Sequence, residues 1–444
     1  MPATLKALLD MRRDELRRSL YMFGSFVLVI STFWILKPLK KALFISFYDQ
    51  RGLSLGSLQL GAARAELVAK LLNLLLASLS AVAFSLLARR FRRHALACLF
   101  CGFFVLCFAL LGTLLSHPTA VVVWTFYLVG DLYSTLMVAA LFVFLHDSTT
   151  VESAKRSYGL VGLGAVLGGV LGSQVVSLLV GALSARAWMA VCCTLTAAVA
   201  VLAWRAGQIP TVSAPGSAHE RRTTPQRSEH AAPLGPYLVC LAGIVGLYEI
   251  VSTILDYQFT ATVAHYLDGP AIGRQLSHAF ALMNVTALLV QLLLTSPLLR
   301  KHGVPAALLV LPFTTLAAAT GMMILPILPV ASLIPALDSG FAYSIHQSAK
   351  EALYVPLGSG AQYGAKAFVD VFVMRGAKAV GVVLSFVITA LVSDFSAVRW
   401  LSLAAVALIV PWLLLSLHAG RRFERLASPH GLGSELAVRR PVVS

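Results

Sequence analysis

The sequence predicts an all-α membrane protein with twelve transmembrane helices in two six-helix halves. Three observations predict this fold. Of the 444 residues, 58% are hydrophobic and only 12% are charged, which is about half the charged share of an ordinary soluble domain. Apolar runs of about 20 residues or more, long enough to cross a bilayer as a helix, recur along the whole chain. A polar segment near the middle divides these runs into two sets of six.

Each apolar run is interpreted as a helix because hydrocarbon offers an open backbone no hydrogen-bond partners. The first run is too long for a cleaved signal peptide and has no small-residue cleavage site after a short apolar core, so it counts as a helix. The expected helices cover 20–47, 66–88, 95–115, 120–146, 157–183, 187–205, 235–262, 276–299, 304–329, 331–354, 368–393 and 396–418.

Basic residues predict the orientation of these helices, because loops rich in lysine and arginine stay in the cytoplasm. Only five of the 35 basic residues fall in the loops that lie outside when the N-terminus is inside. These five are Arg51, Arg64, Arg186, Arg274 and Arg399. We therefore expect a multi-pass protein of a bacterial inner membrane, or an organelle equivalent, with both termini in the cytoplasm.

The polar segment "GQIPTVSAPGSAHERRTTPQRSEHAAPLGP" is rich in proline, serine, threonine and charge, which is typical of a flexible linker. Six helices on each side of it make the halves run parallel, as in the major-facilitator carriers. Similar strings at 153–164 and 348–360 occupy equivalent positions in the two halves. The expected domains are an N-terminal segment (1–19), a first half (20–205), a cytoplasmic linker (206–234), a second half (235–418) and a cytoplasmic tail (419–444).

Several other functions are disfavoured by the residues. The net charge of +16 reflects topology and attraction to anionic lipid, and without a groove-reading module we expect no nucleic-acid partner. The cysteines, "CLFC" at 98–101 included, lie in apolar surroundings, so we expect no metal or other cofactor. The histidines are scattered without ligand spacing, so we expect no enzyme.

The four-residue glycine spacing within 162–172 predicts close packing of two helices.

Charges inside the apolar runs are the strongest functional signal, since each ionised side chain in hydrocarbon costs a few kcal/mol. The first run carries Lys37, Lys40 and Lys41, whose spacing groups them on one side of a helix. We expect Lys41 to extend toward the outer head groups, and Lys37 and Lys40 to face a cavity. Other charges within the runs include Lys70, Asp131, Glu249, Asp256, Asp338, Asp370, Arg375 and Lys378.

Two interpretations of these charges remain open. In the first interpretation, the charges form structural ion pairs that hold the helices of the bundle together. This interpretation suits Asp338 best. Alternatively, they line a central cavity between the halves, where Lys37, Lys40, Arg375 and Lys378 contact an anionic solute and carboxylates pair with them in its absence. Lysine and arginine suit phosphate oxygens, so the second interpretation predicts a polyanionic solute.

Several stretches resemble the nucleotide transporter family of plastids and intracellular bacteria, the ATP:ADP translocases. They are "ILKPLKKALFI" (35–45), "DLYSTLMVAALFVF" (131–144), "TTVESAKRSYGLVGLGA" (149–165), "SAKEALYVPL" and "GAKAFVDVFVMRGAKAVG" within 348–381. The resemblance implies a twelve-helix carrier that exchanges ATP for ADP or imports other nucleotides. It also implies transport roles for Lys40, Asp131, Glu249 and Lys350.

The chain departs from the family pattern in three places. Asp131 stands where glutamate is usual, two acids are missing around Lys37 and Lys40, and the turn after Glu249 holds Asp256 and no cation. Together the two lines of reasoning select candidate solute-binding residues and candidate gating residues. The binding candidates are Lys37, Lys40, Asp131, Glu249, Lys350, Asp370, Arg375 and Lys378. The gating candidates are Lys155, Arg156 and Glu351.

The sequence thus predicts a secondary transporter that moves an anionic, phosphorylated solute by alternating access, with nucleotide exchange of the ATP/ADP type as the first expectation. Its expected partners are this small anion and the lipid bilayer. Two alternatives stay open: a proton-coupled carrier of another organic anion, and a membrane scaffold or sensor that keeps a carrier fold without transporting.

Overall fold

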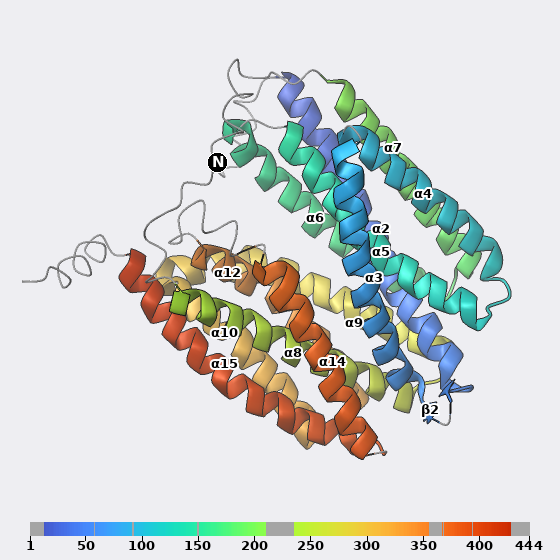
Figure 1. Ribbon diagram of the computed structural model, residues 1–444, viewed down its shortest axis with the longest axis vertical. Helices are drawn as coiled ribbons and strands as arrows, with labels where there is room; N and C mark the ends of the chain where they lie inside the picture. Colours follow the sequence, from blue (N-terminus) through green and yellow to red (C-terminus); the bar gives the residue numbers. More distant parts are fainter. Residues whose placement is uncertain are drawn as a thin grey trace, which may run out of the picture. The chain divides into compact units, whose positions relative to one another are not determined.

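The computed structural model is almost entirely helical (Figure 1). It describes residues 13–56, 58–90, 93–148, 151–209, 235–354, 366, 368–392 and 394–427. Within these ranges, eleven helical runs are long and apolar enough to cross a membrane. Contacts divide the chain into two compact units, one of Met1–Arg222 with Leu267–Asn284 and the other of Thr223–Tyr266 with Val285–Ser444. The predicted all-α membrane fold is confirmed.

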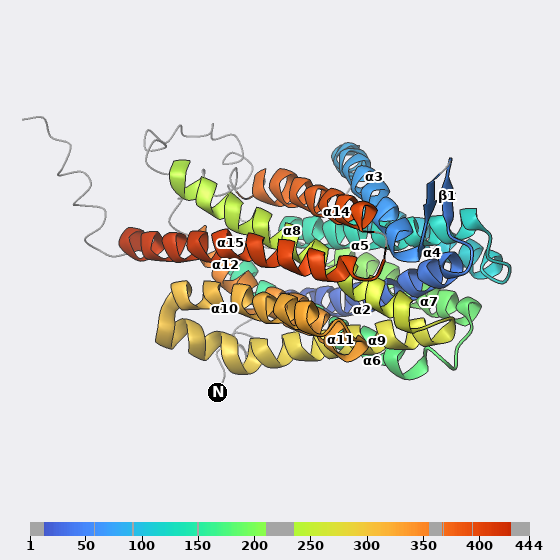
Figure 2. The same cartoon turned by 90° about the horizontal axis from the view of Figure 1, so that it is seen from below.

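The first unit contains seven labelled helices and a short hairpin. The helices are α2 (Arg13–Asp49), α3 (Ala62–Arg90), α4 (Arg93–Leu114), α5 (Ala120–Ser148), α6 (Val151–Leu179), α7 (Ala185–Gln208) and most of α9 (Pro270–Leu289). The antiparallel strands β1 (Leu53–Leu55) and β2 (Leu58–Leu60) join α2 to α3 and are visible beside α3 in Figure 2. Helix α2 packs against α3, α5, α6 and α7 and is therefore central to this unit.

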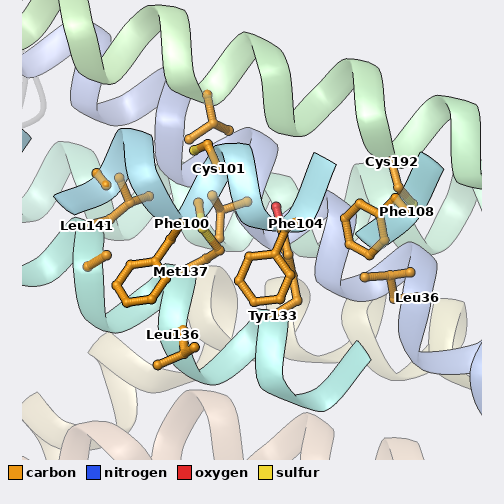
Figure 3. Packing of buried hydrophobic residues seen from close by; sticks show 14 of the residues in the cluster. Leu36, Phe100, Cys101, Phe104, Phe108, Tyr133, Leu136, Met137, Leu141 and Cys192 are labelled. Atoms are coloured by element: carbon orange, nitrogen blue, oxygen red, sulfur yellow. The ribbon is translucent and has the colours of Figure 1, made fainter. Parts of the chain in front are cut away.

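Apolar side chains from five helices, α2, α4, α5, α6 and α7, fill the interior of the first unit, and Figure 3 shows part of this cluster. Phe104 and Phe108 of α4 pack their rings against Tyr133 of α5, with centroid distances of 5.0 and 5.4 Å. Leu36 of α2 and Cys192 of α7 belong to the same cluster and are fully buried. The cysteine is thus a small apolar core residue, as its sequence neighbours suggested.

The glycines of α6 allow its backbone to touch that of α2. An added Cβ would lie 2.9 Å from the Phe23 carbonyl oxygen at Gly164 and 2.5 Å from that of Val27 at Gly168, and it would overlap Ser31 at Gly172. The Ser31 hydroxyl donates to the Gly168 carbonyl oxygen at 3.1 Å. The predicted close packing is therefore confirmed. We call the contact of these three glycines with α2 the glycine seam.

The second unit is built around α8 (Gly235–Tyr266), which packs against α14 (Met374–Leu391) and α15 (Ala397–Ala427). Helix α10 (Ser296–Ile324) lies along α15, as Figures 1 and 2 show. A broken helix runs through α11 (Leu328–Pro335), the π-helical segments η3 (Ala336–Gly340) and η4 (Ala342–His346), and α12 (Gln347–Leu353). Two further π-helical segments are η2 (Val290–Thr295), before α10, and η6 (Val369–Val373), before α14.

The number of spans differs from the predicted twelve at one place. The run Pro270–Ile324 counts as one 55-residue span, although two separate helices were predicted there. Gly303 has a φ of 75° inside this run, so the helix is interrupted at that residue. A positive φ is accessible to glycine because it lacks a Cβ, and the interruption coincides with the predicted gap between 299 and 304. The predicted six-and-six division stays a prediction, because the linker lies outside the described residues.

Candidate solute-binding residues

In the first unit, Lys40 of α2 forms an ion pair with Asp131 of α5. Lys40 is 5% exposed, and the side chain of Asp131 is 23% exposed. Asn73 of α3 donates from Nδ2 to the second carboxylate oxygen at 2.8 Å. An added Cβ at Gly130 would lie 2.9 Å from Lys40 Cδ, so the glycine makes room for the lysine stem. Three helices therefore meet at this pair.

A second ion pair involves Glu66 of α3, which is 1% exposed. Its Oε1 lies 3.4 Å from Lys41 Nζ and accepts a hydrogen bond from the Tyr127 hydroxyl at 3.2 Å. Its Oε2 lies 3.8 Å from Lys70 Nζ. The ring of Tyr127 also lies 4.5 Å from the Lys40 ammonium. Tyr127 thus contacts a member of both ion pairs.

The interpretation of Lys41 as a lysine that extends to the head groups is wrong. Lys41 is 5% exposed and lies beside a buried carboxylate. An ammonium that is removed from water needs such an opposite charge beside it. Glu66 was not among the residues predicted from the sequence, although one signal for it was present. Glu66 and Lys70 stand four residues apart at the start of an apolar run, a spacing at which side chains on one helix meet.

Lys37 has a different environment from the other two lysines. Its ammonium lies 4.5 Å from the ring of Trp34 and 4.9 Å from the ring of Phe280 in α9. Both rings are nearly buried, whereas Lys37 is half-buried. Aromatic faces attract a cation through the negative charge of their π systems. The three lysines of α2 therefore contact three different helices: α9, α5 and α3.

In the second unit, two further lysines lie near carboxylates. Lys378 of α14 is 3.5 Å from Glu249 of α8, with side-chain exposures of 46% and 8%. Lys350 of α12 is 4.0 Å from Asp370 in η6, and this lysine side chain is 10% exposed. Arg375 is half-buried one turn before Lys378. Two opposite-charge pairs therefore lie among the binding candidates of this unit.

The gating candidates are only partly described. Glu351 binds Lys366, with oxygen to nitrogen distances of 2.6 and 2.8 Å, and both side chains are about two-fifths exposed. It does not bind its neighbour Lys350, which faces Asp370. The side chains of Lys155 and Arg156 lie outside the described residues. Their gating role stays a prediction.

The interpretation of Asp338 as a structural ion pair is wrong. Among the described residues its carboxylate has no cation within ion-pair distance, and its partners are the hydroxyls of Ser252 and Ser339, at 2.6 and 3.1 Å. Asp338 is 4% exposed. A buried carboxylate that no cation neutralises is costly in a membrane.

Comparison with known proteins relates the chain to membrane carriers. No protein-family model matches it. ADP,ATP carrier protein 2, chloroplastic, of Arabidopsis thaliana is 24% identical over 382 residues, which cover 76% of this chain and 62% of that protein. A plastidic ATP/ADP-transporter of Solanum tuberosum is 24% identical over 378 residues, which cover 75% and 60%. The chain is a distant relative of these plastidic carriers. It spans about three-fifths of their length.

Solved structures agree with this relationship at the level of the fold. A bacterial homolog of the human lysosomal transporter Spinster matches with a TM-score of 0.62 and 15% identity, over 94% of this chain and all of that one. A peptide transporter POT matches with a TM-score of 0.63 and 11% identity, over 90% and 95%. The nucleoside transporter NupG matches with a TM-score of 0.58 and 12% identity, over 94% and 100%. This distant relative of the plastidic carriers therefore has the major-facilitator-like fold of secondary transporters.

Proposed function

We propose that the protein is a secondary transporter that moves an anionic, phosphorylated solute by alternating access, and that the solute is a nucleotide exchanged in the ATP/ADP manner. The pairing of Lys40 with Asp131 carries this proposal. It brings together two residues for which the family resemblance implies transport roles. Similarity to plastidic ATP/ADP carriers supports the same solute class.

The chemistry of a polyanionic solute fits lysines held by carboxylates. Without solute, Asp131 neutralises Lys40, so neither of these two charges is left without a partner. A phosphate group carries more negative charge than one carboxylate and offers several acceptor oxygens to an ammonium. It can therefore take the lysine from Asp131, and the carboxylate keeps its hydrogen bond from Asn73. Releasing the solute restores the pair.

The second unit repeats this arrangement. Lys350 with Asp370, and Lys378 with Glu249, place a cation from one segment beside a carboxylate from another. Lys378 is nearly half-exposed while Glu249 is almost buried, so the lysine can leave its partner without a large change in its own solvation. We assign Lys37, Lys40, Lys350, Arg375 and Lys378 to contacts with the solute. The remaining candidates, Asp131, Glu249 and Asp370, act as the carboxylates that hold these cations between cycles.

The proposal includes the remaining expectations from the sequence. The protein functions as two halves of six helices, in a bacterial inner membrane, with both termini in the cytoplasm. Lys155, Arg156 and Glu351 act in gating. The partners are a small anion and lipid.

The test is counter-exchange in liposomes. Purified protein is reconstituted, the liposomes are loaded with unlabelled ATP or ADP, and uptake of labelled ATP or ADP is measured with and without the internal nucleotide. We expect uptake that requires the internal nucleotide. Uptake of other phosphorylated anions alone would change the assigned solute, and no uptake of any would favour a scaffold or sensor.

Lys40→Ala is the matched variant for this test. It removes the ammonium that we assign to the phosphate, so uptake should be lost. Lys301→Ala removes an exposed lysine at the start of α10 and should leave uptake unchanged. Equal effects of the two substitutions would contradict the assignment of Lys40.

A further inference from the structure

Asp338 lies inside the broken helix of the second unit, within η3. Its Oδ2 accepts hydrogen bonds from the Ser252 hydroxyl at 2.6 Å and from the Ser339 hydroxyl at 3.1 Å. Its Oδ1 is buried and has no hydrogen-bond partner among the described residues. One oxygen is therefore well bound, while the other is removed from water without compensation.

The groups around Asp338 do not favour a negative charge there. From α8, the Glu249 and Asp256 carboxylates lie close enough to repel it, and the Tyr248 phenol is nearby. Glu249 is itself neutralised by Lys378 of α14 at 3.5 Å. From the broken helix, the Tyr343 phenol is close to Asp338, and the buried ring of His346 lies 5.5 Å from the Tyr248 ring. Among the residues that the structure describes, neither ring nitrogen of His346 has a hydrogen-bond partner, so no acceptor stabilises a cationic form of this ring.

Burial and like charges both favour the neutral carboxylic acid, because an ionised group in a poor solvent is costly unless opposite charges or hydrogen-bond donors stabilise it. The two serine hydroxyls act in the opposite direction, since each can donate to the ionised form. Asp338 therefore has one set of contacts for each protonation state. A group that is held in this way can gain and lose a proton within a working cycle.

The backbone around Asp338 is suited to such a change. η3 and η4 are π-helical, separated by Phe341, and Pro335 lies directly before η3. π-helical turns are rare and occur often at functional sites, because they interrupt the regular hydrogen-bond ladder. A proline also removes one donor from that ladder. This segment can therefore change its local geometry, and with it the access of water to Asp338, more easily than a regular helix.

We propose that Asp338 binds a proton and that the protein moves this proton together with its solute. A proton from water on one face of the membrane adds to a carboxylate oxygen, which forms one O–H bond and cancels one negative charge. On the other face the O–H bond breaks, and the proton returns to water. This inference rests on the proposed transport function and adds a second transported species to it.

The test uses liposomes that contain ADP and a pH-sensitive dye, with labelled ATP outside. With equal pH on both sides, wild type and Asp338→Asn should both exchange nucleotide, because the amide resembles the neutral acid. With a more acidic exterior, wild type should take up ATP faster and acidify the lumen. Asp338→Asn should lose both responses. Asp394→Asn makes the same chemical change at an exposed carboxyl and should behave as wild type.

The outcomes separate the two proposals. Exchange without any response to the pH difference in wild type would overturn the proton proposal and leave nucleotide exchange standing. Absence of exchange under every condition would overturn the proposed function.

A measurement without transport decides the proton site in either case. If the folded protein holds a proton that the unfolded chain releases, the thermal unfolding midpoint of wild type in detergent falls as pH rises. In Asp338→Asn the unfolding midpoint should decrease less with rising pH than in wild type. In Ser252→Ala, which removes a hydrogen-bond donor to the ionised carboxylate, the midpoint should decrease more steeply with pH. Identical pH profiles for wild type and Asp338→Asn would overturn proton binding at this residue.

Discussion

Lys40 of α2 and Asp131 of α5 form an ion pair, and Asn73 of α3 donates to the second carboxylate oxygen. The pair is nearly closed to water on the lysine side, where exposure is 5%. Two explanations of such a pair make different predictions. A structural pair is needed for folding, whereas a transport pair is needed for uptake.

A charge swap separates these explanations. Lys40→Asp combined with Asp131→Lys keeps the opposite charges but places the cation on another helix. We expect the double variant to restore the folded yield and the unfolding midpoint relative to either single variant, and to remain inactive in uptake. Size-exclusion chromatography and liposome exchange provide the measurements. Recovered uptake in the swapped protein would show that the position of the cation is unimportant.

Glu66 should contribute more to stability than Glu351. Glu66→Gln leaves Lys41 and Lys70 near a neutral amide in a buried position, and removing one partner of a buried pair typically costs about 3 kcal/mol or more. Glu351 pairs with Lys366 where both are about 40% exposed, and such pairs contribute about 0–1 kcal/mol. Thermal unfolding of Glu66→Gln and Glu351→Gln in the same detergent compares the two. A larger loss for Glu351→Gln would contradict the burial argument.

Gly168→Ala should destabilise the first unit. The added methyl carbon would lie 2.5 Å from the Val27 carbonyl oxygen, and separating two packed helices to admit it costs about 1–3 kcal/mol. Gly162→Ala is the matched control, because no atom lies within 4 Å of the added carbon. It should be neutral or slightly stabilising, since alanine favours a helix. Folded yield and unfolding midpoint test both. Tolerance of alanine at 168 would mean that α2 and α6 are less tightly packed.

Lys350→Gln should weaken solute binding more than folding. Its ammonium is 4.0 Å from Asp370, a long separation for an ion pair, so its loss removes little internal stabilisation. Loss of one charged contact to a phosphate should raise the nucleotide concentration for half-maximal exchange by about tenfold, equivalent to about 1.4 kcal/mol. Lys301→Gln, at an exposed position, serves as the control. Unchanged nucleotide dependence would remove Lys350 from the binding residues.

The fold could be predicted because its signal is local. Twenty apolar residues in a row need only the absence of water to become helical, and the glycine spacing within 162–172 indicated the close contact that α6 makes with α2. The hairpin Leu53–Leu60 was not predicted, since three-residue strands between two helices carry too little alternation to be recognised. Two helices were predicted over 276–299 and 304–329, whereas the structure has one apolar helical run there that is interrupted at Gly303.

The candidate site could be predicted only in part, because partners are chosen in three dimensions. Charge inside an apolar run identified Lys40 and Asp131, which are 91 residues apart and meet in the structure. Lys41 was predicted to extend to the outer head groups, but it pairs with Glu66 of α3. Nothing in the sequence of its own helix indicates that Glu66 lies beside it. For Asp338, sequence could not distinguish a cation from two serine hydroxyls.

The glycine seam has a mechanical consequence. Two helices whose backbones touch at Gly164, Gly168 and Gly172 cannot slide past each other without first separating, because carbonyl oxygens on α2 lie closer to the Cβ positions of these glycines than a Cβ atom would allow. In the proposed transport cycle we therefore expect α2 and α6 to move as one body. The lysines of α2 belong to that body, so we expect the anion of the proposed cycle to be displaced by a joint movement of both helices and not by the flexing of a single helix.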